Sequence, residues 1–181
     1  GDITGPPEPL LQAIGPIDGL IHNAGSQFPE PLGEWSEQAW SDLWRVHVLG
    51  PALLSQAFAA QCVGPGAIVA ISSTLAERPA PGAAAYSSAK AALTALIRSL
   101  ALELAPKKIR ANAVLPGVVP TAMTRRPEGE LSPEQRLEAL KALHPLGLGE
   151  PEDVAQAVIA LLENPWVTGA TLNVDGGMLS S

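Results

Sequence analysis

Apolar residues alternate along the chain between short continuous runs and longer stretches with helical spacing. Residues 66–71 form a short apolar run between glycine and serine residues, which is typical of a buried strand, and residues 17–21, apolar apart from Asp18 and Gly19, are predicted to form another strand. Residues 34–60, 86–104 and 151–163 carry apolar residues at the spacing of one helix face. This alternation of strand and helix predicts an α/β protein with a parallel sheet covered by helices.

Local signals mark where several of these elements begin and end. Ser36 is a candidate N-cap, and Ser132 followed by Pro133 is typical of a helix start. Asn164-Pro165 ends the last predicted helix. Residues 121–149 are the most irregular part, but no repeat or low-complexity linker divides the chain. We therefore expect residues 1–181 to form a single domain.

Composition narrows the possible partners. The chain has 181 residues, of which 46% are hydrophobic, enough for one substantial core. A net charge of −7 argues against nucleic acid, whose binding depends on Lys and Arg contacts to phosphate. No apolar stretch approaches the roughly 20 residues of a membrane span. Cys62 is the only cysteine, so we expect no internal disulfide, no metal site and a cytoplasmic location.

Tyr86 and Lys90 are the first candidate for chemistry. Residues four apart on a helix lie on one face, about 5–6 Å apart at Cβ. An ammonium beside a phenol favours the phenolate and lowers the pKa of the tyrosine, which suits a general acid/base. The alternative is an ordinary surface pair on one helix face.

Ser73 follows the predicted strand at 66–71 and precedes Tyr86 by thirteen residues. A hydroxyl at the carboxyl end of a parallel strand lies where open α/β sheets bind their ligands. Ser73, Tyr86 and Lys90, in this order and on these elements, resemble the active site of the short-chain dehydrogenase/reductase family.

Further motifs extend the resemblance over nearly the whole chain, and they imply binding sites for NAD or NADP. Asp2-Ile3 is similar to the pair that contacts the adenine, and Asn23-Ala24-Gly25 to the turn beside the ribose. The segment Pro116-Gly117 through Val119 and Thr121 resembles the one that orients the nicotinamide. Tyr86 and Lys90 would contact the cofactor as well.

The chain departs from the family in two ways. Members begin with strands and a turn of the form Thr-Gly-x-x-x-Gly-x-Gly, neither of which precedes Asp2 here. We therefore expect a Rossmann-like, doubly wound parallel sheet that lacks its first three strands, a truncated C-terminal catalytic portion of the fold. His47 stands where most members have an asparagine; it could serve the proton relay or be a buried structural histidine.

The resemblance implies hydride transfer between a nicotinamide and a carbonyl or secondary alcohol of a small molecule, as in a 3-oxoacyl-thioester reductase. Tyr86 would exchange the proton, Lys90 would lower the pKa of Tyr86, and Ser73 would steady the substrate oxygen. Residues 121–149 would form a lid over the substrate. Family members pair the helices at 34–60 and 86–104 across a dimer axis, so we expect a homodimer or homotetramer.

Other readings remain open at this point. The chain could be a non-catalytic remnant or interaction subunit that binds no dinucleotide. An α/β hydrolase with Ser73 as nucleophile would need a Gly-x-Ser-x-Gly elbow, which is missing around Ser73. Arg125 and Arg126 could grip an anionic group or belong to a solvated loop, and we expect His144 to be structural.

Overall fold

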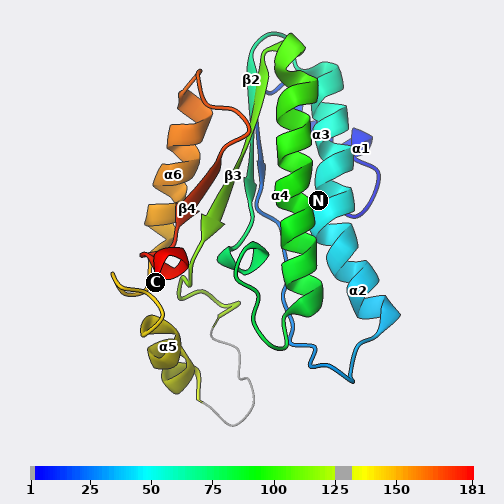
Figure 1. The fold of residues 1–181 in the computed structure, drawn as a ribbon. Coiled ribbons are helices and arrows are strands. Elements are labelled where there is room, and N and C mark those ends of the chain that lie inside the picture. Colours follow the sequence, from blue (N-terminus) through cyan, green and yellow to red (C-terminus); the bar gives the residue numbers. More distant parts are fainter. Residues whose placement is uncertain (1–2, 125–131) are drawn as a thin grey trace.

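The computed structural model describes residues 3–124 and 132–181. Within these ranges, four strands form one parallel sheet in the order β1-β2-β3-β4 (Figure 1). The strands are β1 (Gly19–His22), β2 (Gly66–Ile71), β3 (Ile109–Pro116) and β4 (Thr171–Val174). The predicted parallel α/β sheet is confirmed.

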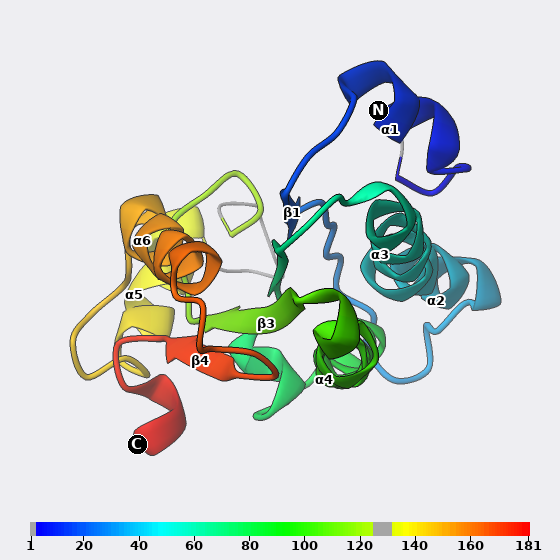
Figure 2. The same ribbon diagram turned by 90° about the horizontal axis from the view of Figure 1, so that it is seen from above.

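Helices cover both faces of the sheet, as expected for a doubly wound fold (Figure 2). Figure 2 shows α2, α3 and α4 on one side of the strands and α5 and α6 on the other. The helices are α1 (Glu8–Ile14), α2 (Glu37–Trp44), α3 (Gly50–Gln61), α4 (Ala84–Leu104), α5 (Pro133–Lys141) and α6 (Pro151–Glu163).

The central strand β2 is apolar throughout because each face of the sheet packs against helices. Ile68 and Ala70 of β2 belong to a core that contains Phe58 of α3 and Leu93 of α4. Val69, between them, packs instead in the cluster on the α6 side. Since successive side chains of a strand point to opposite faces, a strand buried on both faces shows no polar alternation.

The predicted element boundaries hold closely, with two informative differences. The Ser36 hydroxyl accepts the Ala39 N–H at 3.1 Å, and Ser132 with Gln135 forms a capping box. The predicted helix at 34–60 is interrupted by a π-helical turn, Arg45–Leu49, between α2 and α3. The first strand extends from Gly19 to His22 instead of 17–21, because Gly19 is the first residue to pair with β2.

All four strands run in the same direction, so their carboxyl ends form one edge of the sheet. Asn23, Ser72, Gly117 and Asp175 each follow one of these strands directly.

In the part of the chain described, no helix is both long and apolar enough to cross a membrane.

Candidate active site

A cavity of about 670 Å³ opens at the carboxyl edge of the sheet. It gathers predicted site residues that are far apart in the sequence. Those that line it are His47, Ser73, Tyr86, Lys90, Asn23, Gly25, Pro116, Gly117, Val119 and Thr121.

Two predicted cofactor-binding residues of the described chain, Ile3 and Ala24, are not among those that line the cavity. The carbonyl oxygen of Ile3 lies against the start of α3, where a Cβ on Gly50 would come within 2.7 Å of it. Ala24 is exposed between Asn23 and Gly25. Asp2 lies outside the described residues, as do Arg125 and Arg126.

Tyr86 lies in the first turn of α4 with its ring almost completely buried. Burial raises the pKa of Tyr86 to about 12, and a hydrogen bond with the Ser73 side chain acts in the opposite direction. The Ser73 oxygen also accepts the Leu75 N–H at 3.1 Å, which fixes its place after β2. The phenol is therefore protonated at neutral pH. It is hydrogen-bonded to Ser73, the serine expected from the sequence to share its site.

Lys90 lies one turn further along α4, with its Nζ 5.6 Å from the centre of the Tyr86 ring. Nζ donates a hydrogen bond to the Ile71 carbonyl oxygen at 2.7 Å. Burial lowers the pKa of Lys90 to about 8. The pKa of Tyr86 is raised overall because desolvation of the phenolate dominates, and the lowering effect expected of Lys90 stays a prediction.

Two hydroxyls that the sequence did not single out tie α4 to the end of β2. The Ser72 hydroxyl donates to the Lys90 carbonyl oxygen at 3.0 Å and lies 2.9 Å from the Thr94 hydroxyl oxygen. Thr94 also donates to the Lys90 carbonyl, at 3.0 Å. This network holds the helix turn that carries Lys90. A serine beside Ser73 and a threonine four residues after Lys90 were the available signals.

His47 occupies the π-helical turn and is buried beside Tyr86, with the two ring centres 5.3 Å apart and the rings nearly perpendicular. Burial, followed by the charge of Lys90, lowers the pKa of His47 to about 4, so the imidazole is neutral at pH 7. Nε2 lies 2.7 Å from the Ser26 carbonyl oxygen and 3.4 Å from the Ser26 nitrogen, and the much shorter contact with the acceptor favours the proton on Nε2. Nδ1 is buried without a hydrogen-bond partner among the described residues, which leaves it as an acceptor.

The loop after β3 is bonded on several sides. Gly117 N–H donates to the Val174 carbonyl oxygen at 2.9 Å, which joins the loop to β4. The Thr124 hydroxyl donates to the Val119 carbonyl oxygen at 2.9 Å and accepts the Thr121 N–H at 2.8 Å. Thr124 was missed in the sequence, where it lies in a polar stretch without a distinctive pattern.

Known proteins share this arrangement. Residues 7–179 match the family described as enoyl-(acyl carrier protein) reductase. Carbonyl reductase (NADPH) 2 of Sus scrofa is 36% identical over 180 residues, covering 96% of this chain and 72% of that protein. The 3-oxoacyl-(acyl-carrier-protein) reductase FabG of Thermotoga maritima is 34% identical over 177 residues, covering 95% and 70%.

Solved structures of other proteins have a similar fold. A blue fluorescent protein from a metagenomic library, in complex with NADPH, has a TM-score of 0.86 at 35% identity and covers 98% of this chain and 73% of its own. A gluconate 5-dehydrogenase from Burkholderia cenocepacia, in complex with NADP and tartrate, has a TM-score of 0.88 at 28% identity, covering 100% and 74%. The chain belongs to the short-chain dehydrogenase/reductase family. It is an oxidoreductase of the kind that acts on CH–OH or C=O groups.

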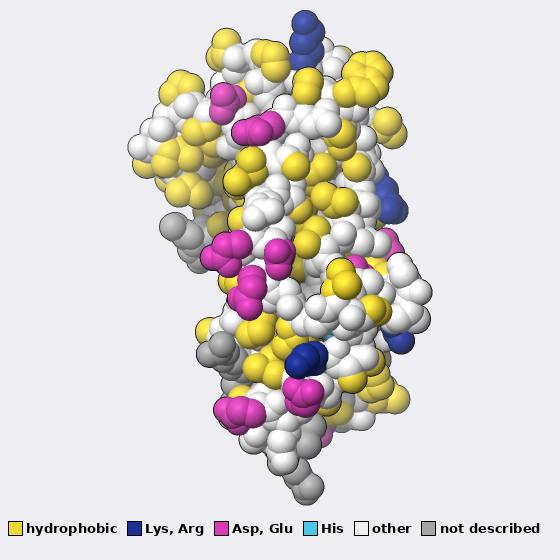
Figure 3. All heavy atoms as spheres, turned by 90° about the vertical axis from the view of Figure 1, so that its left-hand side faces the viewer, with side chains coloured by type: hydrophobic (Ala, Val, Ile, Leu, Met, Phe, Trp, Pro, Cys, Tyr) yellow, Lys and Arg dark blue, Asp and Glu magenta, His cyan; other side chains and the backbone are white. Residues whose placement is uncertain are grey.

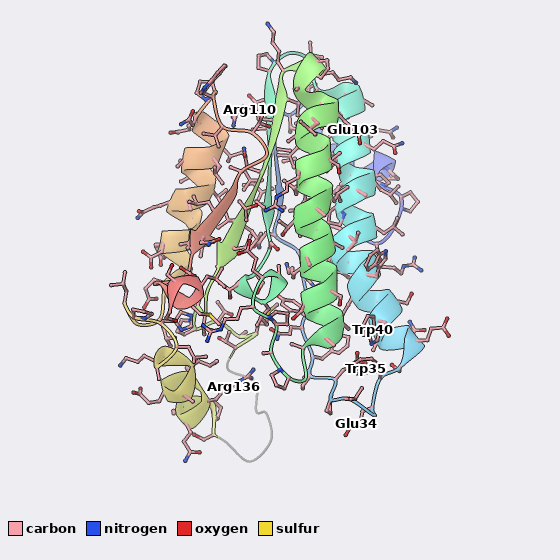
Figure 4. The ribbon with its side chains drawn as sticks, viewed as in Figure 1. Glu34, Trp35, Trp40, Glu103, Arg110 and Arg136 are labelled. Atoms are coloured by element: carbon pink, nitrogen blue, oxygen red, sulfur yellow. The ribbon has the colours of Figure 1, made fainter. Side chains whose placement is uncertain are left out.

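The cavity of this short-chain dehydrogenase/reductase is also lined by large apolar side chains, among them Phe28, Leu75, Met123, Leu140, Leu143 and Met178. Three of these, Met123, Leu140 and Leu143, belong to residues 121–149, the segment expected to form a lid over the substrate. Two cations, Lys90 and Arg136, also line the cavity, whereas none of its described lining residues is acidic. Figure 4 shows Arg136 on α5, below the carboxyl edge of the sheet. A protein with a net charge of −7 thus presents a cavity free of carboxylates among its described lining residues.

Proposed function

We propose that Tyr86 is the general acid/base of a hydride transfer between a nicotinamide and the carbonyl or secondary alcohol of a small molecule. The observation that carries the proposal is the Tyr86 hydroxyl bonded to Ser73, with Lys90 alongside, in one cavity at the carboxyl edge of the sheet. The cofactor is NAD or NADP, the dinucleotides found with the related structures. When bound, the nicotinamide supplies or accepts the hydride.

Each catalytic residue has a distinct task in this proposal. In the reductive direction Tyr86 donates its proton to the substrate oxygen, and in the oxidative direction it accepts the proton of the alcohol. Ser73 hydrogen-bonds the same oxygen and stabilises its developing charge. Lys90 holds a positive charge beside the tyrosine, and its pKa of about 8 leaves it mostly protonated at pH 7. That charge favours the phenolate each time Tyr86 loses its proton.

His47 is proposed to take part in the proton relay. Its Nδ1 is an acceptor without a partner among the described residues, and its ring contacts the ring of Tyr86. The tautomer with the proton on Nε2 leaves Nδ1 able to accept a hydrogen bond from a water molecule or from a protonated group of the relay.

The residues present fit a dinucleotide at this edge. Asn23, Gly25, Pro116, Gly117, Val119 and Thr121 line the cavity around Tyr86 and Lys90. The absence of a Cβ at Gly25 and Gly117 keeps the backbone close to the buried imidazoles behind it. A cavity with two cations and no acidic side chain among its described lining residues suits an anionic cofactor. Contacts of Asp2, Ile3 and Ala24 with the cofactor stay predictions.

The apolar side of the cavity supports a substrate whose carbonyl is attached to an apolar body. A 3-oxoacyl thioester meets this description, and the FabG relative is named for that substrate class. We also considered a remnant or interaction subunit that binds no dinucleotide. The relatives do not support this alternative, because they are named as reductases. A single domain, a homodimer or homotetramer and a cytoplasmic location stay predictions.

Replacing Tyr86 with phenylalanine tests the proposal. We expect Tyr86→Phe to lower turnover by about 100-fold or more, since a positioned acid/base contributes about that much or more. Dinucleotide affinity, measured by calorimetry, should change little because the ring is kept. Ser88→Ala, at an exposed position of the same helix, is the control. Turnover close to wild type in Tyr86→Phe would refute the assignment.

A further inference from the structure

The backbone segment Gly117–Val119, which we call the β3 exit loop, is held from behind the cavity by His144. The imidazole of His144 is 4% exposed. Its Nε2 accepts the Val118 N–H at 3.0 Å, and its Nδ1 lies 2.8 Å from the Leu140 carbonyl oxygen of α5. One buried ring therefore joins the exit loop to α5, the helix whose Leu140 lines the cavity.

These two bonds select one form of the ring. A backbone N–H can only donate, so Nε2 must carry a lone pair, and a carbonyl oxygen can only accept, so Nδ1 must carry the proton. In the opposite tautomer, the Nε2–H group would point at the Val118 N–H, and the unprotonated Nδ1 would face the Leu140 carbonyl oxygen. Neither pair can form a hydrogen bond. The imidazolium would lose the acceptor for Val118. Only the neutral tautomer with the proton on Nδ1 satisfies both the Val118 N–H and the Leu140 carbonyl oxygen.

The contact is close enough to restrict the residue at position 117. A Cβ on Gly117 would lie 2.7 Å from Nε2 of His144 and 2.9 Å from the Cα of Asp175. Only glycine allows the exit loop to lie against the ring and against the end of β4 at once. Gly149 completes the support, since its N–H donates to the Val118 carbonyl oxygen at 3.2 Å.

Both partners of His144 reach the proposed active site. The exit loop lines the cavity, and so do Leu140 and Leu143. His144 is not among the lining residues of this cavity, so it acts through its neighbours.

We propose that His144 is a positioning residue that fixes the β3 exit loop and α5 in one mutual arrangement, and so sets where the nicotinamide lies relative to the substrate wall. The inference rests on the proposed function and on the resemblance of Pro116–Thr121 to the segment that orients the nicotinamide. His144 itself touches no reacting atom.

Two matched substitutions separate the bonds of the ring. In His144→Asn the side-chain amide can still donate to the Leu140 carbonyl, but nothing accepts the Val118 N–H. In His144→Gln the side-chain oxygen can reach the Val118 N–H, while the donor to Leu140 is lost. Both replace an imidazole with an amide, so a general loss of packing affects both alike.

The first measurement is amide hydrogen exchange at Val118 by NMR, which needs no cofactor. We expect exchange to be faster by about tenfold or more in His144→Asn and close to wild type in His144→Gln. Long-range ¹H–¹⁵N spectra of wild type should show a protonated Nδ1 and an unprotonated Nε2. Unchanged protection of Val118 in His144→Asn, or the opposite tautomer, would overturn the inference.

The second measurement concerns the cofactor. With 4-deuterated nicotinamide dinucleotide, His144→Asn should raise the primary isotope effect on kcat, because hydride transfer becomes slower in a displaced geometry. Dinucleotide binding should weaken by about tenfold, because the exit loop is no longer held in place. His144→Gln should restore both. If wild type binds the dinucleotide and His144→Asn alters neither quantity, this inference fails alone. If wild type binds none, the proposed function fails and the inference with it.

Discussion

Three side chains of the site share one physical influence, which is burial. It lowers the pKa of His47 to about 4, lowers that of Lys90 to about 8 and raises that of Tyr86 to about 12. In each case water is removed from the charged form, so the neutral form is favoured. At neutral pH His47 and Tyr86 are therefore uncharged, and the mostly protonated Lys90 carries the positive charge of the three.

The buried ammonium of Lys90 makes the stability of the protein depend on pH. Its pKa is about 8 in the folded state and 10.5 when unperturbed, so the unfolded chain binds the extra proton between these values. The free energy of unfolding should then rise with pH from 8 toward 10. Above pH 10, Tyr86 acts in the opposite direction because its pKa is raised on folding.

We predict that Lys90→Met abolishes this rise. The contribution of Lys90 to the free energy of unfolding should reach about 3 kcal/mol over its full window. Urea unfolding of both proteins at pH 7.5 and pH 10 measures it, and the difference between the two proteins removes the contributions that they share. An equal rise in Lys90→Met would contradict a depressed lysine pKa.

At the scale of elements, the helices follow local sequence signals where such signals exist. Ser36 and Ser132 cap the helices that they were expected to cap, and α6 runs from Pro151 to Glu163 as predicted. The π-helical turn at Arg45–Leu49 has no such signal. It aims His47 at Ser26 and Tyr86, and these contacts lie in other elements, so a local pattern does not encode it.

The π-helical turn also explains the glycine of the Asn-Ala-Gly turn. A Cβ on Gly25 would lie 2.7 Å from Cε1 of His47. The backbone of Gly25 does not have a positive φ, so the requirement for glycine is one of space. The turn after β1 and the π-helical turn are thus fitted to each other.

We predict that Gly25→Ala destabilises the protein by about 1–3 kcal/mol through overpacking against His47. The cost should fall by at least half in a His47→Asn background, because the shorter side chain leaves room for the methyl group. A double-mutant cycle by thermal unfolding measures the coupling. Gly19→Ala is the control, because Gly19 has no positive φ and a Cβ there would meet only Cδ2 of Leu162, at 3.9 Å. Additive costs would contradict the contact.

At the scale of the whole molecule, apolar side chains remain on both helical layers. Leu53 of α3 and Leu102 of α4 are 37% and 79% exposed. On the other side, Figure 3 shows hydrophobic side chains spread over the face that carries α6, where Ile159 is 51% exposed. Exposed apolar groups of this kind are consistent with association of several copies.

We predict that the protein sediments as a homodimer or homotetramer and that Leu53→Glu shifts it toward a smaller species. A charge on the outer face of α3 would have to be buried in an interface made by α3 and α4. Leu32→Glu, in the loop before α2, is the control and should leave the mass unchanged. A monomeric wild-type protein, or one indifferent to Leu53→Glu, would contradict the prediction.

The sequence by itself determined the alternation of strands and helices, the family, and the grouping of Ser73, Tyr86 and Lys90, because these depend on local periodicity and on spacing along single elements. Only the tertiary structure decided the direction of the Tyr86 pKa, the tautomers of His47 and His144, and the roles of Ser72 and Thr124. Desolvation and hydrogen bonding depend on which distant elements come together around a side chain. No local pattern in the chain contains that information.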